Sequence, residues 1–443
     1  MFKRFRQTSA TAVAAVLGCA LIVAAPAAAK EKPKKEEEQK GAQLKPSKEF
    51  SPALKKLTEA AKAKDMAALE AALAEGQASA TSPDDKYLVS FYELQLGIGK
   101  SDKAIQGKAL DGMLESGLTP PESLAAYNFF SGNFAYGDKD NFFSGNFAYG
   151  DKDYAKAVKR LEAAKAAGST EQGLPVLLMD SYLKLNQVDQ GLAVAKDAIA
   201  AARAAGRVPS EELYVRPAGA LQAAKRNGEL LDMLAMRLED YPQPVIWRNT
   251  LFILLQQEAS DKVMNLDTFR LMRATKSMTQ RPEYLEYAAL ATEAGYPSEA
   301  VAVIKEGQAA NVIQTSDERF NTILESQEPR AKADAVALKA DAAKPATAAN
   351  PKLARQTADG LIGIGDYATA ISLYEKAAAG GDPLAQYRLG VAQALAGQKD
   401  AAIASFAKVQ GDRARLANLW TIHLSAKAPA AAAAAAPAAA PAN

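Results

Sequence analysis

Apolar side chains recur every three or four residues along most of the chain, whereas the strict alternation typical of β-strands is scarce. This spacing places the apolar side chains on one face of a helix and predicts an all-α protein. Helix starts are indicated where a hydroxyl residue precedes proline and an acid follows three positions on, as from Ser82 to Asp85. The expected helices form pairs with short turns: 87–96 with 102–115, 174–185 with 189–204, 211–225 with 229–239, and 284–293 with 298–308.

One helix pair recurs in succession near the C-terminal end. The segment 365–374 corresponds to the later segment 397–406. A small residue is repeated at Ala370 and Ala402, and an aromatic residue at Tyr374 and Phe406. A single helix pair cannot bury its apolar face alone, so repeated pairs must stack on one another. The pattern therefore predicts a solenoid, an α-α superhelix of helix hairpins.

These residues resemble the tetratricopeptide repeat family. The family places a small residue in the first helix, another early in the second helix, and an aromatic residue four positions later. Gly390, Ala402 and Phe406 fit this pattern, and the match is clear over 355–411. The resemblance implies hairpins whose first helices line a concave groove, which holds an extended peptide or a partner helix.

The resemblance also implies candidate groove residues, because Arg and Asn side chains can bind the backbone or carboxylate of a peptide. It implies a non-catalytic scaffold with a protein or peptide partner, and end-to-end self-association is an alternative interaction. Carried over by position, the candidate partner-binding residues are Asn141, Asn146, Arg355, Arg388 and Gln393.

The segment 128–140 is repeated without change at 141–153. The second copy matches the repeat pattern in register, so the first copy is expected to be the extra one. An insert of this length in a continuous helix would turn its earlier face by about 220°. We therefore expect residues 137–140 to break the helix. The first copy is then either a tolerated insert, an aggregation-prone segment or an exposed patch for a partner, formed by Phe129, Phe130, Phe134 and Tyr136.

The two ends of the chain differ in composition from the rest. Residues 1–29 resemble a secretory signal peptide with cleavage after Ala29, which predicts a periplasmic or secreted protein of a bacterial envelope. An alternative is an outer-membrane lipoprotein acylated at Cys19. The expected organisation comprises a charged linker at 30–49, a helical-hairpin solenoid at 50–326 with an insert at 241–279, an Ala/Lys-rich helix or spacer at 327–350, a repeat pair with a capping helix at 351–425, and a disordered Ala/Pro tail at 426–443.

Candidate chemistry is sparse along the chain. Without the leader, no cysteine remains and the only histidine is His423, so neither a metal site nor a cofactor is expected. The 53 basic and 51 acidic residues are nearly balanced, which disfavours a nucleic-acid partner. Beyond the leader no apolar run is long enough to span a bilayer. We predict a non-enzyme, with an envelope hydrolase that uses carboxylates around 241–279 as the alternative.

Overall fold

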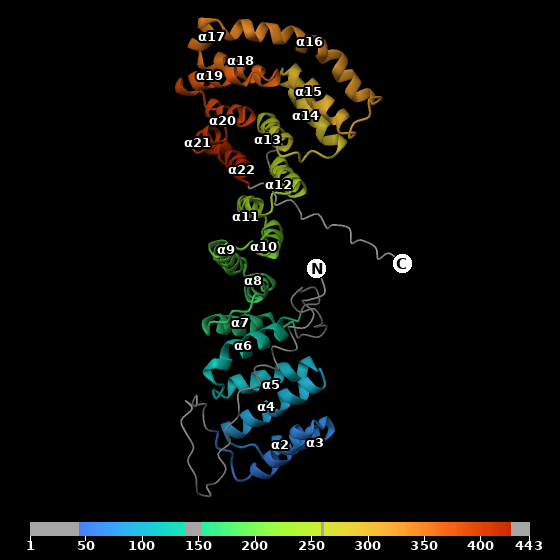
Figure 1. The fold of residues 1–443 in the computed structure, drawn as a ribbon, viewed down its shortest axis with the longest axis vertical. Coiled ribbons are helices and arrows are strands. Elements are labelled where there is room, and N and C mark those ends of the chain that lie inside the picture. Colours follow the sequence, from blue (N-terminus) through green and yellow to red (C-terminus); the bar gives the residue numbers. More distant parts are fainter. Residues whose placement is uncertain (1–43, 138–151, 258–260, 427–443) are drawn as a thin grey trace, which may run out of the picture. The chain divides into compact units, whose positions relative to one another are not determined.

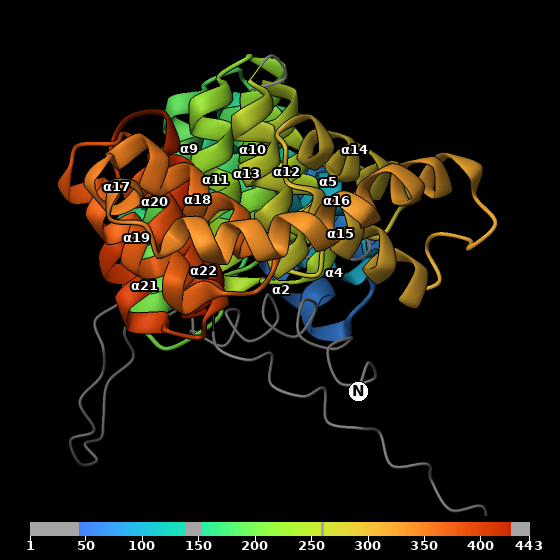
Figure 2. The ribbon, with the colours of Figure 1, turned by 90° about the horizontal axis from the view of Figure 1, so that it is seen from above.

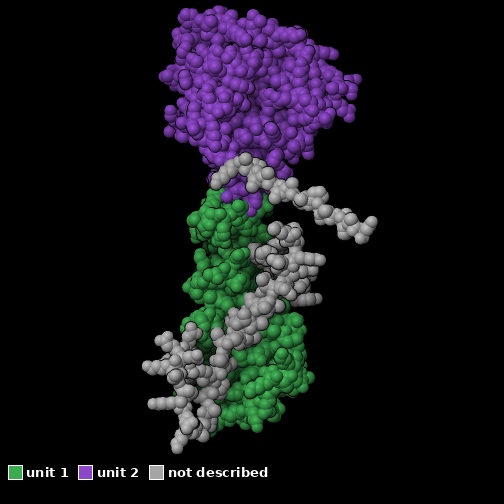
Figure 3. Space-filling view, viewed as in Figure 1, with its two compact units in different colours: residues 1–220 green, residues 221–443 purple. Residues whose placement is uncertain are grey.

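The computed structural model describes residues 44–137, 152–257 and 261–426. Within these residues all regular elements are helices, which confirms the all-α prediction. They divide into two compact units, Met1–Ala220 and Leu221–Asn443, each described here by itself (Figure 3). None of the described helices is long and apolar enough to cross a membrane.

Unit 1 is a series of antiparallel helix hairpins, each packed on the next (Figure 1). Asp65, Ser82, Asp102 and Asp153 cap the starts of helices by accepting backbone hydrogen bonds. The helices of unit 1 are α2 (Ser51–Ala63), α3 (Met66–Ser79), α4 (Pro83–Gly99), α5 (Lys103–Glu115), α6 (Pro121–Tyr136), α7 (Tyr154–Ala166), α8 (Leu174–Lys184) and α9 (Val188–Ala204), and α10 (Glu212–Ala223) begins in it.

The hairpins share one backbone hydrogen bond at their turns. The residue that precedes the second helix donates its N–H to the carbonyl five positions earlier. Asp102 donates to Gly97 at 2.8 Å, Asp366 to Leu361 at 3.1 Å, and an equivalent bond closes the α8–α9 and α20–α21 turns. This bond satisfies a carbonyl that the end of the first helix would otherwise leave unpaired.

The first and last helices of unit 2 pack against each other. Its last helix, α22, packs on α11 and α20, and the long α16 lies against α15 and α18 (Figure 2). The helices of unit 2 are α11 (Asn227–Asp240), α12 (Pro244–Gln257), α13 (Lys262–Ala274), α14 (Arg281–Glu293), α15 (Pro297–Ala309), α16 (Glu318–Ala342), α17 (Pro345–Ala349), α18 (Pro351–Gly363), α19 (Tyr367–Ala379), α20 (Ala385–Leu395), α21 (Lys399–Phe406), the 3-10 turn η2 (Gly411–Arg413) and α22 (Ala414–Ser425).

Two regions without a clear repeat pattern are helical. The expected insert at 241–279 contains α12 and α13, which contact each other less extensively than the two helices of the repeat hairpins do. The Ala/Lys-rich stretch at 327–350 is helical in α16 and α17. The expected capping helix at the end of the repeat pair is α22, and it buries Leu416, Leu419 and Trp420. Because α22 contacts α11 as well as α20, it connects the two ends of unit 2.

Candidate functional site

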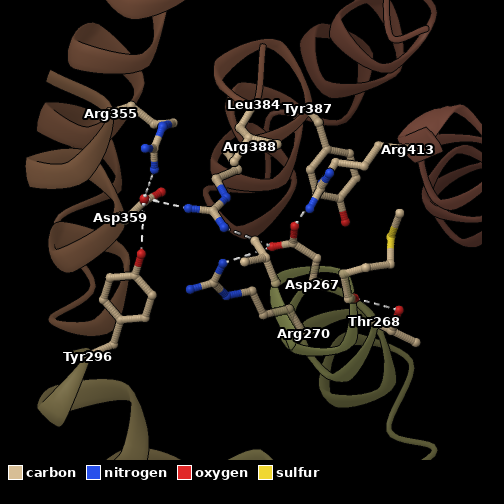
Figure 4. Close-up of polar contacts among 12 residues, drawn as sticks. Asp267, Thr268, Arg270, Tyr296, Arg355, Asp359, Leu384, Tyr387, Arg388 and Arg413 are labelled. Carbon is tan, nitrogen blue, oxygen red and sulfur yellow. Dashed lines mark hydrogen bonds and ion pairs between the residues drawn. The ribbon is translucent and has the colours of Figure 1, made fainter. Parts of the chain in front are cut away.

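Arg388, which the sequence placed in a concave groove, lies in the interior of unit 2. It projects from α20, is 3% exposed, and lies between two buried carboxylates. Its guanidinium forms an ion pair with Asp359 of α18 and another with Asp267 of α13, the latter at 3.5 Å (Figure 4). Arg388 therefore links α13, α18 and α20, and it has no exposed surface to offer a peptide in this conformation.

Each of these two carboxylates has further partners. Asp359 accepts hydrogen bonds from Arg355 at 2.7 Å, from the hydroxyl of Tyr374 at 2.7 Å and from the hydroxyl of Tyr296 at 3.0 Å. Burial raises the pKa of Tyr374 well above its usual value, and the neighbouring negative charge of Asp359 raises it further. The phenol therefore stays a hydrogen-bond donor. Arg355 also donates to Asp382, at 3.0 Å, so it too is committed to the network.

Asp267 connects α13 to the C-terminal end of unit 2. It accepts from Arg270, one turn away, at 3.0 Å, and from Arg413 of η2 at 3.1 Å (Figure 4). Arg270 donates two further hydrogen bonds to Glu299, at 2.8 and 2.7 Å. Burial alone would raise the pKa of Glu299, but the charge and hydrogen bonds of Arg270 more than offset it, and the pKa lies below its usual value.

These four arginines and four carboxylates, here called the ionic core, form one network of ion pairs within unit 2. Gln393, another candidate groove residue, is also buried on α20. A cavity of only about 210 Å³ remains beside Arg388 and Tyr296. This volume lies below the range of about 300–1,000 Å³ that is usual for clefts that hold small ligands. The ionic core consists of Asp267, Arg270, Glu299, Arg355, Asp359, Asp382, Arg388 and Arg413.

In unit 1 the prediction of an exposed aromatic patch is wrong. The four side chains of the first copy belong to the buried core, and Tyr136 is only 1% exposed. The hydroxyl of Tyr136 donates to Asp180 of α8, and Arg216 of α10 pairs with the same carboxylate at 3.0 Å. The buried residues of this patch are Phe129, Phe130, Phe134 and Tyr136.

The first copy also occupies the repeat position that the sequence assigned to the second. Gly132 lies so close to α7 that a Cβ atom there would be 2.7 Å from Leu161. The expected break after the first copy is confirmed, because α6 ends at Tyr136 with Gly137 in a left-handed conformation. Residues 138–151 lie outside the described part of the chain, and so do the candidate groove residues Asn141 and Asn146.

Helix continuity explains why the first copy takes this position. α6 runs without interruption from Pro121 through Tyr136, so its apolar residues keep one face. An insertion inside the helix would break its hydrogen bonds, whereas an insertion in the turn costs only loop-closure entropy. The α6–α7 turn retains its closing bond, because Asp153 donates to Ala135 at 3.0 Å. The donor and acceptor of this bond are further apart in sequence than the five positions found at the other hairpin turns. The difference in separation equals the length of one copy.

An open cleft of about 670 Å³ lies in unit 1, among residues that the sequence had not singled out. α9 has 17 residues and α8 has 11, so the end of α9 extends past α8 by about 9 Å. Val208, in the connection from α9 to α10, lines the cleft and is 67% exposed. The apolar lining includes Leu174, Val176, Val194, Ala198, Ala201 and Val208, and the charged lining residues are Lys165, Glu171, Asp197 and Arg207.

No family model and no curated protein matches this chain. Among solved structures, it is similar to a tetratricopeptide repeat protein from Parabacteroides merdae, at 14% identity over 69% of this chain and 98% of that one, with a TM-score of 0.24. It is also similar to the P58(IPK) TPR domain, at 10% identity over 84% of this chain and 97% of that one, with a TM-score of 0.20. The described residues form helix hairpins packed in sequence, the arrangement that the resemblance to tetratricopeptide repeats implies.

Proposed function

We propose that this protein is a non-catalytic scaffold of a bacterial cell envelope that binds a protein partner through the cleft of unit 1. Residues 1–29 would direct export, with cleavage after Ala29, and 30–43 would form a linker. The expected linker is wrong at its C-terminal end, because Leu44 is buried in unit 1 and Ser47 donates two hydrogen bonds to Asp85. The mass of the mature N-terminus distinguishes cleavage from acylation at Cys19.

The apolar floor and open mouth of the cleft support this proposal. Ala201 and Val208 lie on its surface and are solvent-exposed, which costs free energy unless another apolar surface covers them. The cleft falls within the volume range of ligand sites. An apolar segment of a partner, anchored by aliphatic side chains and flanked by polar residues, matches this lining.

The ionic core of unit 2 is a weaker candidate for partner binding because its arginines already have carboxylate partners. Arg355 and Arg388 are held by Asp359, and a partner carboxylate would have to displace that buried aspartate. The proposed partner-binding roles of Arg355, Arg388 and Gln393 therefore require a more open form of unit 2. The roles proposed for Asn141 and Asn146 concern residues outside the described part.

The test is partner capture from an envelope extract with residues 44–426 as bait, followed by measured affinities for each enriched protein. Ala201→Glu places a charge in the apolar cleft and should weaken binding at least tenfold. Ala68→Glu, on the exposed face of α3, is the matched control and should bind like the parent chain. Equal binding by both variants would locate the interface elsewhere, and the absence of any saturable partner would refute the scaffold function.

A further inference from the structure

Asn227 and Gly228 form the only Asn–Gly pair of the chain, and they are the first two residues of α11. Both residues are exposed. An asparagine side chain is attacked most readily by the backbone nitrogen of a following glycine, because glycine has no β-carbon that restricts the backbone around that nitrogen. Every other asparagine inside the chain precedes a larger residue, so Asn227 is the position where the sequence most favours this reaction.

The start of α11 leaves the backbone nitrogen of Gly228 without a helical hydrogen bond. The N–H of Leu230 donates to the carbonyl of Arg226 at 3.0 Å, and the N–H groups before it lie too near the helix start to have an acceptor within the helix. α11 also has no side-chain cap at Arg226, and glycine in a helix costs about 1 kcal/mol relative to alanine. The first turn of α11 can therefore open at low cost. Opening is needed, because the helical conformation holds the nitrogen of Gly228 away from the side-chain carbonyl carbon of Asn227.

One contact with α22 holds this turn closed. Arg415 of α22 donates to the carbonyl of Gly228 at 3.3 Å and pairs with Asp232, one turn further along α11, at 3.2 Å. The contact belongs to the packing of α22 on α11, which joins the first and last helices of unit 2. Opening of the turn moves the carbonyl of Gly228 away from Arg415. The population of the open turn therefore depends on whether α22 is in place.

We propose that Asn227 is a site of spontaneous deamidation, and that the contact between α22 and α11 controls its rate. In the open turn the amide nitrogen of Gly228 loses its proton and bonds to Cγ of Asn227. The bond from Cγ to Nδ2 breaks, and Nδ2 leaves as ammonia with that proton. Water then opens the cyclic imide at either of its two carbonyl carbons, which receives the hydroxyl group while the nitrogen receives the hydrogen. The product is aspartate or isoaspartate, and either adds a negative charge.

The two products differ in their effect on α11. Aspartate leaves the backbone unchanged and places its charge at the start of α11, where the helix dipole favours it. Isoaspartate adds a carbon atom to the main chain just before Gly228 and so moves the carbonyl of Gly228 relative to Arg415. The isoaspartate product should therefore loosen α22 and unfold at a lower urea concentration than the parent chain. Asn227→Asp, which reproduces the aspartate product, should unfold at the same or a higher urea concentration.

Incubation of the full chain at neutral pH tests the site. Peptide mass spectrometry should find that Asn227 is converted well before Asn311, which is exposed but precedes Val312. Gly228→Ala should slow the conversion at least about tenfold, because a β-carbon restricts the backbone next to the attacking nitrogen. The added methyl group meets only Arg415, at 3.6 Å, which is an ordinary contact, so the fold is retained. If Asn227 and Asn311 are converted at the same rate, the assignment of the site is wrong.

Arg415→Met tests the role of α22. This variant keeps a long side chain and removes its hydrogen bonds to Gly228 and Asp232. The population of the open turn should rise by the equivalent of one hydrogen bond, so the conversion of Asn227 should become roughly two- to tenfold faster. Lys376→Met, on the exposed face of α19, also removes one positive charge and should leave the rate unchanged. Equal rates in Arg415→Met and the parent chain would refute control by α22.

A fluorescence control separates the opening of one turn from unfolding. Both tryptophans of the chain, Trp247 and Trp420, are buried in unit 2. Their fluorescence should show that unit 2 of each variant remains folded during the incubation. Adding Gly228→Ala to Arg415→Met should return the conversion to a slow rate. If the double variant is converted as fast as Arg415→Met alone, attack by the nitrogen of Gly228 is not the route, and the proposal fails.

Discussion

Removal of one copy of the duplicated segment should stabilise unit 1. Because the copies are identical, deletion of 128–140 and deletion of 141–153 produce the same polypeptide. α6 ends at Tyr136 and α7 begins at Tyr154, so either deletion shortens the connection 137–153 to an ordinary hairpin turn. The closing bond of Asp153 would again span five positions, as in the neighbouring hairpins.

The size of the effect follows from loop closure. Each doubling of loop length costs about 0.6 kcal/mol, so shortening the connection by two doublings should raise the free energy of unfolding of unit 1 by about 1 kcal/mol. This corresponds to roughly 2–4 °C in the melting temperature of a unit of this size. Urea unfolding followed by circular dichroism measures the change, and tryptophan fluorescence of unit 2 should stay constant.

The opposite result would be equally informative. A loss of stability of about 1 kcal/mol or more would mean that the removed residues make stabilising contacts, so the insertion could not be regarded as an addition to the turn. A loss of helical dichroism beyond that of the deleted segment would show that α6 depends on them. Either result would refute the argument that the hairpin is complete without one copy.

Three further predictions concern single residues. Arg388→Met should lower the stability of unit 2 by about 1.5–3 kcal/mol in fluorescence-monitored urea unfolding, since Asp267 and Asp359 lose one shared cation while each keeps another arginine partner. Burial lowers the pKa of His423, so the unfolded chain takes up the proton first, and unit 2 should lose stability as pH falls below about 6.5. His423→Phe should abolish that loss, because the chain has no other histidine. Burial would raise the pKa of Asp85, but hydrogen bonds from Ser47 and Ser82 lower it to about 2. The ionised carboxylate therefore contributes about 2 kcal/mol of stability, which should be lost as the pH falls from about 4 to about 2. Asp85→Asn should show no such loss.

Local sequence patterns predicted the helices because their causes are local. The hydroxyl–proline–acid pattern at Ser82 forms a capping box in the structure, in which the carboxylate of Asp85 accepts a hydrogen bond from the backbone N–H of Ser82. The expected helices at 174–185 and 189–204 differ from α8 and α9 by one residue at an end. Periodicity and capping both act within a few residues, so a single chain without relatives is enough to detect them.

The position in the repeat alone predicts the wrong copy for α6, because it takes no account of helix continuity. The repeat pattern places the end of the first helix a fixed number of residues before α7, and this spacing favours the second copy. A helix that begins at Pro121 and continues without a break contains the first copy, which is the copy that the structure shows in α6. The rotation of about 220° expected for an insert inside the helix was the available signal. An insertion avoids that rotation when it lies in the turn. The structure therefore places the extra residues in the turn, where their cost in free energy is lower.

The burial of Arg388 in unit 2 could not be predicted for a different reason, because the residues around it are distant in sequence. Arg413 and its partner Asp267 are 146 residues apart. No local sequence pattern indicates that η2 contacts α13 and that α22 packs on α11. An arginine on the first helix of a hairpin has the same local sequence whether it faces solvent or a buried aspartate. Its exposure depends on whether a later segment covers it, and that is a property of the tertiary fold.

The closure of unit 2 by α22 depends mainly on apolar packing rather than on its ion pairs. Buried ion pairs contribute little net stability, because the loss of hydration offsets their attraction. Trp420 is 1% exposed, stacks on Phe406 with ring centroids 5.9 Å apart, and donates its indole N–H to Tyr387. Burying such aromatic surface is the larger favourable term. The ionic core then contributes specificity: Arg388 and Arg413 find their carboxylates only when α20 and η2 sit in this register, because any displacement leaves a buried charge without a partner.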